Sequence, residues 1–230
     1  MLFNKGFALF ATILSVVSAA PVKCKTADSL SPLDRLAYLN EVFVNQTLAQ
    51  DPNYFANLTL GQNPSIIYIG CSDSRVSIDV ITESRPGDIF EHRNIANSVT
   101  LDDVDTLAVL QYAVEDLYIK DIVISGHTYC GGIKAVLSGY DSLTGALSEW
   151  LAPIKQLYDD NSATIDGISD SYLKARTLTE MNVNRVVNLV NGLDIVTGAR
   201  NNGQTVNVHG WIFLMESGLF HDLNITKSAN

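Results

Sequence analysis

Two short segments of this 230-residue chain carry side chains that can hold a metal ion and do chemistry beside it. Cys71, Asp73 and Arg75 alternate in the first segment. His127 and Cys130 stand in the second. Two thiolates and one imidazole suit zinc, and structural zinc sites usually have four protein ligands, whereas catalytic sites leave one coordination position open. Three ligands therefore favour an open, catalytic zinc site.

Two other interpretations of these residues stay open. A distant histidine could close the site as a fourth ligand, and the chain offers three more: His92, His209 and His221. The two cysteines could instead form a redox pair of thiols. Such a pair would need neither an imidazole nor the Asp-x-Arg pattern beside its first thiol, so we favour the open zinc site.

Each segment follows an apolar run that predicts a buried β-strand. Residues 66–69 lead into Gly70 and the first cysteine, and residues 122–125 lead into Gly126 and the histidine. Continuous apolar runs of this kind are typical of parallel strands buried on both faces. A helical stripe in residues 102–117 predicts the crossover between the two strands. Ligands bind beyond the carboxyl ends of such strands, so we expect one shared site.

Asp73 and Arg75 are positioned to assist a metal. Two thiolates cancel the charge of Zn²⁺, so bound water is acidified less than at a site with three imidazoles. Asp73 can accept a hydrogen bond from that water and orient it. Arg75 can keep Asp73 ionised through a charge-assisted pair. A solvent-exposed loop pair is the alternative, but their placement two and four residues after a ligand favours a role in function.

The motifs resemble those of the β-class carbonic anhydrases. Residues 71–75 and 126–132 are similar to the paired zinc motifs of that family. Residues 87–97 resemble its connecting motif, and residues 208–212 resemble its C-terminal strand. The resemblance extends from about residue 30 to residue 223. Within the family, the sequence most resembles the plant-like subtype, and it resembles a secreted, fungal member.

This resemblance implies a reaction and a set of roles. One zinc ion per chain is bound by Cys71, His127 and Cys130, and Asp73 and Arg75 form the catalytic dyad. Zinc-bound hydroxide hydrates carbon dioxide reversibly to bicarbonate and a proton. In some members the matching aspartate moves onto the zinc and gives an inactive form.

The resemblance also implies a substrate pocket and a partner. Gln62 matches a glutamine that hydrogen-bonds substrate, and the backbone of Gly131 lies against substrate. Phe90, Ile95 and Tyr112 match pocket positions contributed across a dimer, although ordinary core packing would also explain them. In the family the N-terminal helices wrap the partner subunit, so we expect a homodimer or a higher homo-oligomer.

The rest of the sequence predicts a single α/β domain in residues 20–230. We expect a mostly parallel central sheet flanked by helices, an N-terminal helical arm over about residues 20–60, and an antiparallel C-terminal edge strand. Ser31 and Pro32 predict a helix start, with the helix running to about Ala49. Further helices are expected at residues 145–159 and 171–191, a surface loop at 159–170 and a strand at 205–215.

Residues 1–19 have the pattern of a secretory signal peptide, with Lys5, an apolar run and then small residues. The run is short for a membrane anchor. Three N-x-S/T sequons, at Asn45, Asn57 and Asn224, are candidate glycosylation sites. We therefore expect a secreted glycoprotein. Cys24 is left over from the metal site and is a candidate for an intermolecular disulfide.

The formal net charge of −10 argues against nucleic acid and against an anionic membrane as partners. The alternative functions are a secreted zinc-binding protein of the same fold with little turnover, and hydrolysis of a small substrate such as carbon disulfide. Glu91 and Leu214 depart from the family pattern, which bears on oligomer contacts. Intact Asp73, Arg75 and Gln62 favour a working carbonic anhydrase.

Overall fold

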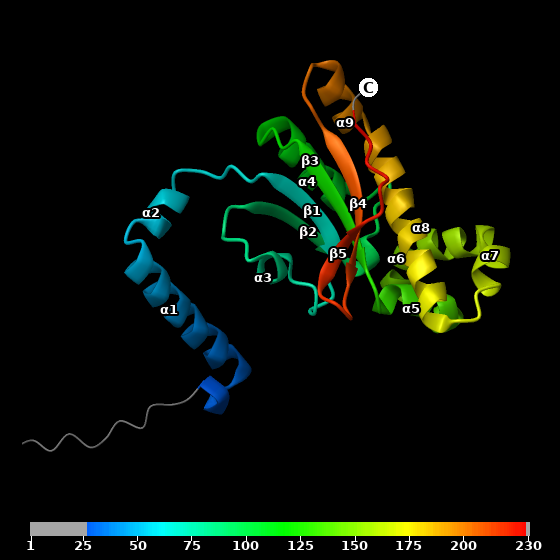
Figure 1. Ribbon diagram of the computed structural model, residues 1–230, viewed down its shortest axis with the longest axis horizontal. Helices are drawn as coiled ribbons and strands as arrows, with labels where there is room; N and C mark the ends of the chain where they lie inside the picture. Colours follow the sequence, from blue (N-terminus) through cyan, green and yellow to red (C-terminus); the bar gives the residue numbers. More distant parts are fainter. Residues whose placement is uncertain (1–26, 229–230) are drawn as a thin grey trace, which may run out of the picture. The chain divides into compact units, whose positions relative to one another are not determined.

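A computed structural model describes residues 27–228 of the chain (Figure 1). The chain divides between Thr59 and Leu60 into two compact units. The predicted signal peptide and Cys24 lie outside the described residues.

The first unit is the predicted helical arm. It contains a 3₁₀ turn η1 (Ala27–Ser29), α1 (Pro32–Gln50) and α2 (Tyr54–Leu58). Ser31 caps α1 as expected, because its hydroxyl accepts a hydrogen bond from the backbone N–H of Asp34. Phe43 and Phe55 join the two helices through rings whose centroids lie 6.0 Å apart. No residue of α1 is buried, and Leu36, Leu39 and Phe43 of its apolar stripe are exposed.

The second unit is built on a five-stranded sheet of order β2-β1-β3-β4-β5. Its strands are β1 (Ile66–Cys71), β2 (Ile89–Asn94), β3 (Asp121–His127), β4 (Asn207–Leu214) and β5 (Leu219–Asp222). The first four strands pair in parallel, and β5 pairs antiparallel with β4 at the edge. The predicted fold class, with its antiparallel C-terminal edge strand, is confirmed.

The helical elements of this unit are α3 (Ile78–Thr82), η2 (Ile95–Asn97), α4 (Val104–Gln111), the π-helical turn η3 (Tyr112–Asp116), α5 (Gly131–Ser138), η4 (Tyr140–Ser142), α6 (Gly145–Asp160), α7 (Ser162–Asp166), α8 (Ser171–Gly192) and α9 (Asp194–Asn201). The surface loop expected at residues 159–170 is wrong in part, because α7 lies within it. Ile165 of α7 is fully buried, which explains why this short polar stretch folds as a helix.

The crossover between the two metal-bearing strands is less direct than the sequence predicts. An extra strand, β2, follows β1, and α4 with η3 then connects β2 to β3. β2 lies at the edge of the sheet beside β1. Its residues are mostly half-buried and include charged side chains, as befits an edge strand. It therefore lacks the continuous apolar run that marks β1 and β3.

Two apolar clusters hold the helices on the sheet. In the larger one, α4, α8 and α9 pack on β1, β3 and β4, with Val183, Val186 and Val187 of α8 fully buried. In the second, α5, α6 and α7 pack on the metal-bearing loops, and Cys71 and Cys130 are members of this cluster. These three helices gather around the N-terminal half of α8 (Figure 1).

Gly126 lets α8 approach the strand that carries His127. A Cβ at this position would lie 2.7 Å from the Cγ2 atom of Thr179 and 2.9 Å from the Cγ2 atom of Val183. Both side chains belong to α8, so the helix packs directly on the backbone at the end of β3.

We predict that Gly126→Ala destabilises the protein by about 1–3 kcal/mol, because α8 must move away from β3 to admit the methyl group. Gly192→Ala at the end of α8 is the control, since a Cβ there meets nothing within 4 Å. Urea denaturation followed by circular dichroism measures both. Equal unfolding free energies for the two variants would contradict the packing described here.

Candidate metal centre

Cys71, His127 and Cys130 meet at the carboxyl ends of β1 and β3. Cys71 is the last residue of β1, His127 is the last residue of β3, and Cys130 directly precedes α5. Their ligand atoms lie within 4.8 Å of one another, and all three residues are buried. In residues 27–228 they are the one group of at least three His, Cys, Asp or Glu side chains arranged in this way.

His127 presents a free lone pair to this group. Its Nδ1 atom lies 2.8 Å from the carbonyl oxygen of Thr128. A carbonyl can only accept, so Nδ1 carries a hydrogen, and in the neutral tautomer with this hydrogen bond Nε2 is the unprotonated nitrogen. Nε2 is buried and has no hydrogen-bond partner. Buried polar atoms are normally satisfied, and a metal ion is the partner that fits this one.

The two thiols interact with each other and with the backbone. Hydrogen bonding between them lowers the pKa of Cys71 and raises the pKa of Cys130, because the pair shares one proton. Cys71 Sγ also accepts a hydrogen bond from the N–H of Ala96, at 3.3 Å. A divalent cation between the sulfurs would replace the shared proton, since metal-bound thiols are deprotonated. The donor set therefore fits zinc.

Within residues 27–228, no further histidine lies close enough to act as a fourth ligand. His92 Nε2 lies 2.9 Å from the Thr106 hydroxyl, and His209 Nε2 lies 2.9 Å from a carboxylate oxygen of Asp121. His221 is an exposed residue of β5. None of the three belongs to the Cys-His-Cys group. Three protein ligands would leave one coordination position open, as in catalytic zinc sites.

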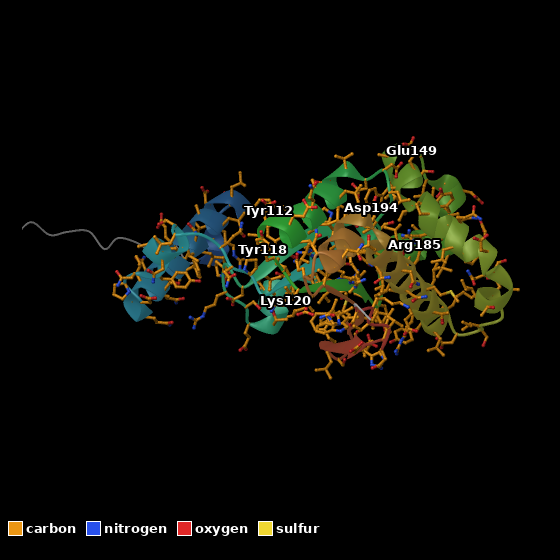
Figure 2. The ribbon with its side chains drawn as sticks, turned by 90° about the horizontal axis from the view of Figure 1, so that it is seen from above. Tyr112, Tyr118, Lys120, Glu149, Arg185 and Asp194 are labelled. Carbon is orange, nitrogen blue, oxygen red and sulfur yellow. The ribbon has the colours of Figure 1, made fainter. Side chains whose placement is uncertain are left out.

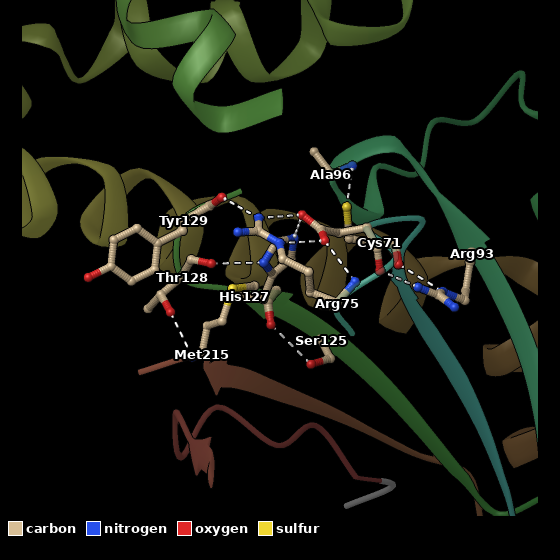
Figure 3. Close-up of polar contacts among 11 residues, drawn as sticks. Cys71, Arg75, Arg93, Ala96, Ser125, His127, Thr128, Tyr129 and Met215 are labelled. Carbon is tan, nitrogen blue, oxygen red and sulfur yellow. Dashed lines mark hydrogen bonds and ion pairs between the residues drawn. The ribbon is translucent and has the colours of Figure 1, made fainter. Parts of the chain in front are cut away.

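Asp73 and Arg75 form a bidentate ion pair beside the Cys-His-Cys group (Figure 3). Arg75 Nε donates to Asp73 Oδ1 at 2.9 Å, and Arg75 Nη2 donates to Oδ2 at 2.7 Å. These hydrogen bonds hold the pKa of Asp73 well below its usual range. The side chain of Asp73 is 15% exposed and that of Arg75 is 53% exposed, so the carboxylate is sheltered while its partner reaches solvent. Its Oδ2 lies 3.9 Å from His127 Nε2.

Two further contacts fix the loop that carries this pair. Arg93 of β2 donates through Nε to the carbonyl of Cys71 at 2.8 Å and through Nη2 to the carbonyl of Asp73 at 2.6 Å. Arg75 Nη2 also donates to the carbonyl of Tyr129, at 3.2 Å, which ties the first loop to the second. Figure 3 shows Arg93 on the far side of Cys71 from Tyr129.

Asn182 of α8 also supports the site, because its Nδ2 donates to the carbonyl of Ala96 at 3.0 Å. Ala96 has a φ of 59°, in the left-handed region that disfavours a residue with a side chain. Sequence reasoning missed the roles of Arg93 and Asn182. The available signal for Arg93 was its place in the connecting motif at residues 87–97, whereas Asn182 lies in none of the motifs.

The predicted substrate residues separate into two sets. Ile95 lies close to the metal loops, because a Cβ on Gly132 would come 3.3 Å from its Cγ2 atom. Gly131 is exposed at the start of α5, directly after Cys130. The structure therefore brings Ile95 and Gly131 to the site.

The other three lie elsewhere in the same chain. Phe90 pairs with Ile67, four residues before the end of β1, which is roughly 13 Å along the strand. Tyr112 lies beside Phe90, with ring centroids 5.8 Å apart. Gln62 is exposed in the segment that precedes β1, so it adjoins the opposite end of that strand from Cys71.

Comparison with known proteins places this geometry in a family. The family model described as carbonic anhydrase matches residues 66–220. A carbonic anhydrase of Emericella nidulans is 38% identical over 192 residues, covering 84% of this chain and 83% of the relative. The crystal structure of a tetrameric β-carbonic anhydrase from Sordaria macrospora superposes with a TM-score of 0.81 at 33% identity, over 85% of this chain and 98% of that one. The chain belongs to the β-class carbonic anhydrases.

A second solved structure agrees with this assignment. The β-carbonic anhydrase of Coccomyxa, in complex with acetazolamide, matches with a TM-score of 0.80 at 32% identity, over 87% of this chain and 89% of that one. The β-class carbonic anhydrases are zinc enzymes, and the Cys-His-Cys group is present in this member.

The structure also bears on the candidate glycosylation sites and on membrane-spanning helices. The sequon residues Asn45, Asn57 and Asn224 are all exposed, and their glycosylation stays a prediction. Within residues 27–228, no helix has the length and apolar character needed to cross a membrane.

We predict near-stoichiometric zinc in the purified protein and its loss in Cys130→Ser, because a hydroxyl replaces one thiolate ligand. Mass spectrometry of the metal content after gel filtration measures both. Cys24→Ser makes the same substitution outside the group and should keep zinc. Full zinc retention in Cys130→Ser would exclude the assignment.

Proposed function

We propose that this chain catalyses the reversible hydration of carbon dioxide to bicarbonate and a proton, with one zinc ion held by Cys71, His127 and Cys130. The observation that carries the proposal is the free, buried Nε2 of His127, which lies with two thiols beside an ionised carboxylate. The relatives that bear the name carbonic anhydrase support it.

Zinc bound at this group would supply a Lewis acid that lowers the pKa of water and so provides a nucleophile at neutral pH. The contribution of Asp73 follows from its ionisation. An ionised carboxylate can only accept hydrogen bonds, and Oδ2 of Asp73, which accepts one hydrogen bond from Arg75, has a lone pair left. Asp73 therefore accepts the O–H of the nucleophile and directs its remaining lone pair toward carbon dioxide.

Arg75 keeps Asp73 both charged and in position. Its guanidinium bonds both carboxylate oxygens, and its backbone N–H donates to Oδ1 at 3.0 Å. We propose that the pair holds the carboxylate beside the metal group and leaves the fourth coordination position to solvent.

We predict that Asp73→Asn keeps zinc but lowers kcat/KM for carbon dioxide by about a hundred-fold or more. The amide can donate as well as accept, so it no longer enforces one orientation of the nucleophile. Stopped-flow hydration assays measure the change, and Asp121→Asn at the opposite end of β3 is the control. An Asp73→Asn enzyme with normal kinetics would refute the role.

The lowered pKa of Asp73 predicts how the hydration activity depends on pH. A carboxyl whose pKa is lowered stays ionised until the pH falls through that lower value. Loss of activity through its protonation therefore belongs well below its ordinary pKa of about 4. The wild-type rate profile should show no step from Asp73 near neutral pH.

We further propose that each complete active site uses two copies of the chain. Gln62, Phe90 and Tyr112 lie away from the metal group of their own chain, so a second copy would have to supply them. The Sordaria relatives are tetrameric, which supports an oligomer of at least two chains.

We predict that two inactive variants restore activity when they are co-expressed. In a mixed dimer of Asp73→Asn and Gln62→Ala, one of the two sites combines an intact metal side with an intact Gln62. Random pairing leaves roughly a quarter of all sites intact. Hydration assays on the co-purified mixture measure the recovery. Activity no higher than that of the separate variants would show that each site is built from one chain.

A further inference from the structure

A cavity lies behind the metal loop, between α5 and α8. Its volume is about 520 Å³, and its lining includes Tyr129, Lys134 and Leu137 on one side and Tyr172 and Arg176 on the other. Cys130 is the one metal-group residue in the lining, and neither member of the Asp-Arg pair contributes to it. The cavity is therefore distinct from the face on which the dyad lies.

The charge of this lining is opposite to that of the chain. It contains three cationic side chains, Lys134, Lys174 and Arg176, and no carboxylate, although the chain has 25 acidic and 15 basic residues. Such a concentration of positive charge in a concave surface attracts anions.

The three cations differ in their partners. Lys174 pairs with Asp166 at 3.2 Å, and Arg176 Nε pairs with Glu180 at 2.8 Å. The ammonium group of Lys134 has no hydrogen bond or ion pair with any described residue. Glu180 engages Nε of Arg176 and the Tyr172 hydroxyl is a second partner of its guanidinium, which leaves other N–H donors of Arg176 available. An anion in the cavity would therefore find an unpaired ammonium and free guanidinium hydrogens.

The remainder of the lining is largely apolar. Leu137, Ala175 and the rings of Tyr129 and Tyr172 contribute to it, and the two ring centroids lie 5.6 Å apart. Organic ligands bind in mostly apolar cavities of roughly 300–1,000 Å³ that carry a few polar groups. An inorganic ion would leave most of this surface uncovered. We propose that the cavity binds a small organic carboxylate with an apolar body, its carboxylate on Lys134 and Arg176.

The position of the cavity gives its ligand a route to the dyad. The Tyr129 ring lines the cavity, while the Tyr129 carbonyl accepts a hydrogen bond from Arg75. Tyr129 has a φ of 60°, in the left-handed region, so this conformation depends on contacts with neighbours. One of those neighbours is Tyr172, whose hydroxyl donates to Glu216. A ligand that moves the Tyr129 ring therefore also moves the anchor of Arg75.

Calorimetric titration of the purified holoenzyme with benzoate tests the proposal, and benzamide is the neutral molecule of the same shape. We expect benzoate to bind and benzamide to bind at least several-fold more weakly. Lys134→Gln should weaken benzoate roughly five-fold, as expected for one exposed charged contact. Lys120→Gln is the matched control, because Lys120 (labelled in Figure 2) is also exposed but directly precedes β3, whereas the cavity-lining loop follows the other end of that strand. This measurement does not depend on the proposed function.

Carboxylates also bind zinc, so a second measurement separates the two sites. The visible spectrum of the cobalt-substituted protein reports on ligands of the metal and should stay unchanged at benzoate saturation. Benzoate should lower kcat for carbon dioxide without raising KM, because it acts through Arg75. A changed cobalt spectrum, or equal benzoate affinity in Lys134→Gln and Lys120→Gln, would overturn the site. An unchanged kcat at saturation would overturn the link to Arg75.

Discussion

The parallel pairing of β1 with β3 is the constraint on which the rest of the structure depends. The register aligns Ile66 with Asp121 and Ile69 with Ile124, so the two strands end at the same edge of the sheet. A slip of one residue would turn each side chain to the opposite face. Cys71 and His127 would then no longer converge. The apolar contacts of α8, including its approach to Gly126, help to hold the strands in this register.

Two arginines, Arg93 and Arg75, hold the loops that follow β1 and β3, and each has a different role. Arg93 donates to two backbone carbonyls of the first loop and pairs with Glu91 on its own strand, so it fixes the path of the chain. Arg75 bonds a carboxylate and one carbonyl of the second loop, so it fixes both a charge and the spacing between loops. Backbone position and side-chain ionisation are therefore set by separate groups. This division keeps the carboxylate charged even though its side chain is largely buried.

Much of this could be predicted from the sequence where the information is local. Apolar runs that end in glycine identify β1 and β3, and the ligands stand directly after those runs. β2 could not be predicted in the same way, since an edge strand carries Glu91 and Arg93 among its apolar residues. The support that Asn182 gives to Ala96 joins residues far apart in sequence, and no local pattern encodes it. The cavity behind Tyr129 likewise exists only because α5 approaches α8.

The membership of both thiols in an apolar cluster has a consequence for how the protein matures. Cys71 and Cys130 are surrounded by Ile133, Leu151 and Ile154, so water has little access to the sulfurs once α5 and α6 have packed. Two thiolates without a cation are costly in such surroundings. Binding of a metal ion by the thiolates therefore favours the packing of α5 and α6, and that packing in turn favours retention of the ion while the protein folds. An ion acquired at that stage would exchange slowly afterwards, which makes its retention a matter of kinetic trapping as much as of affinity.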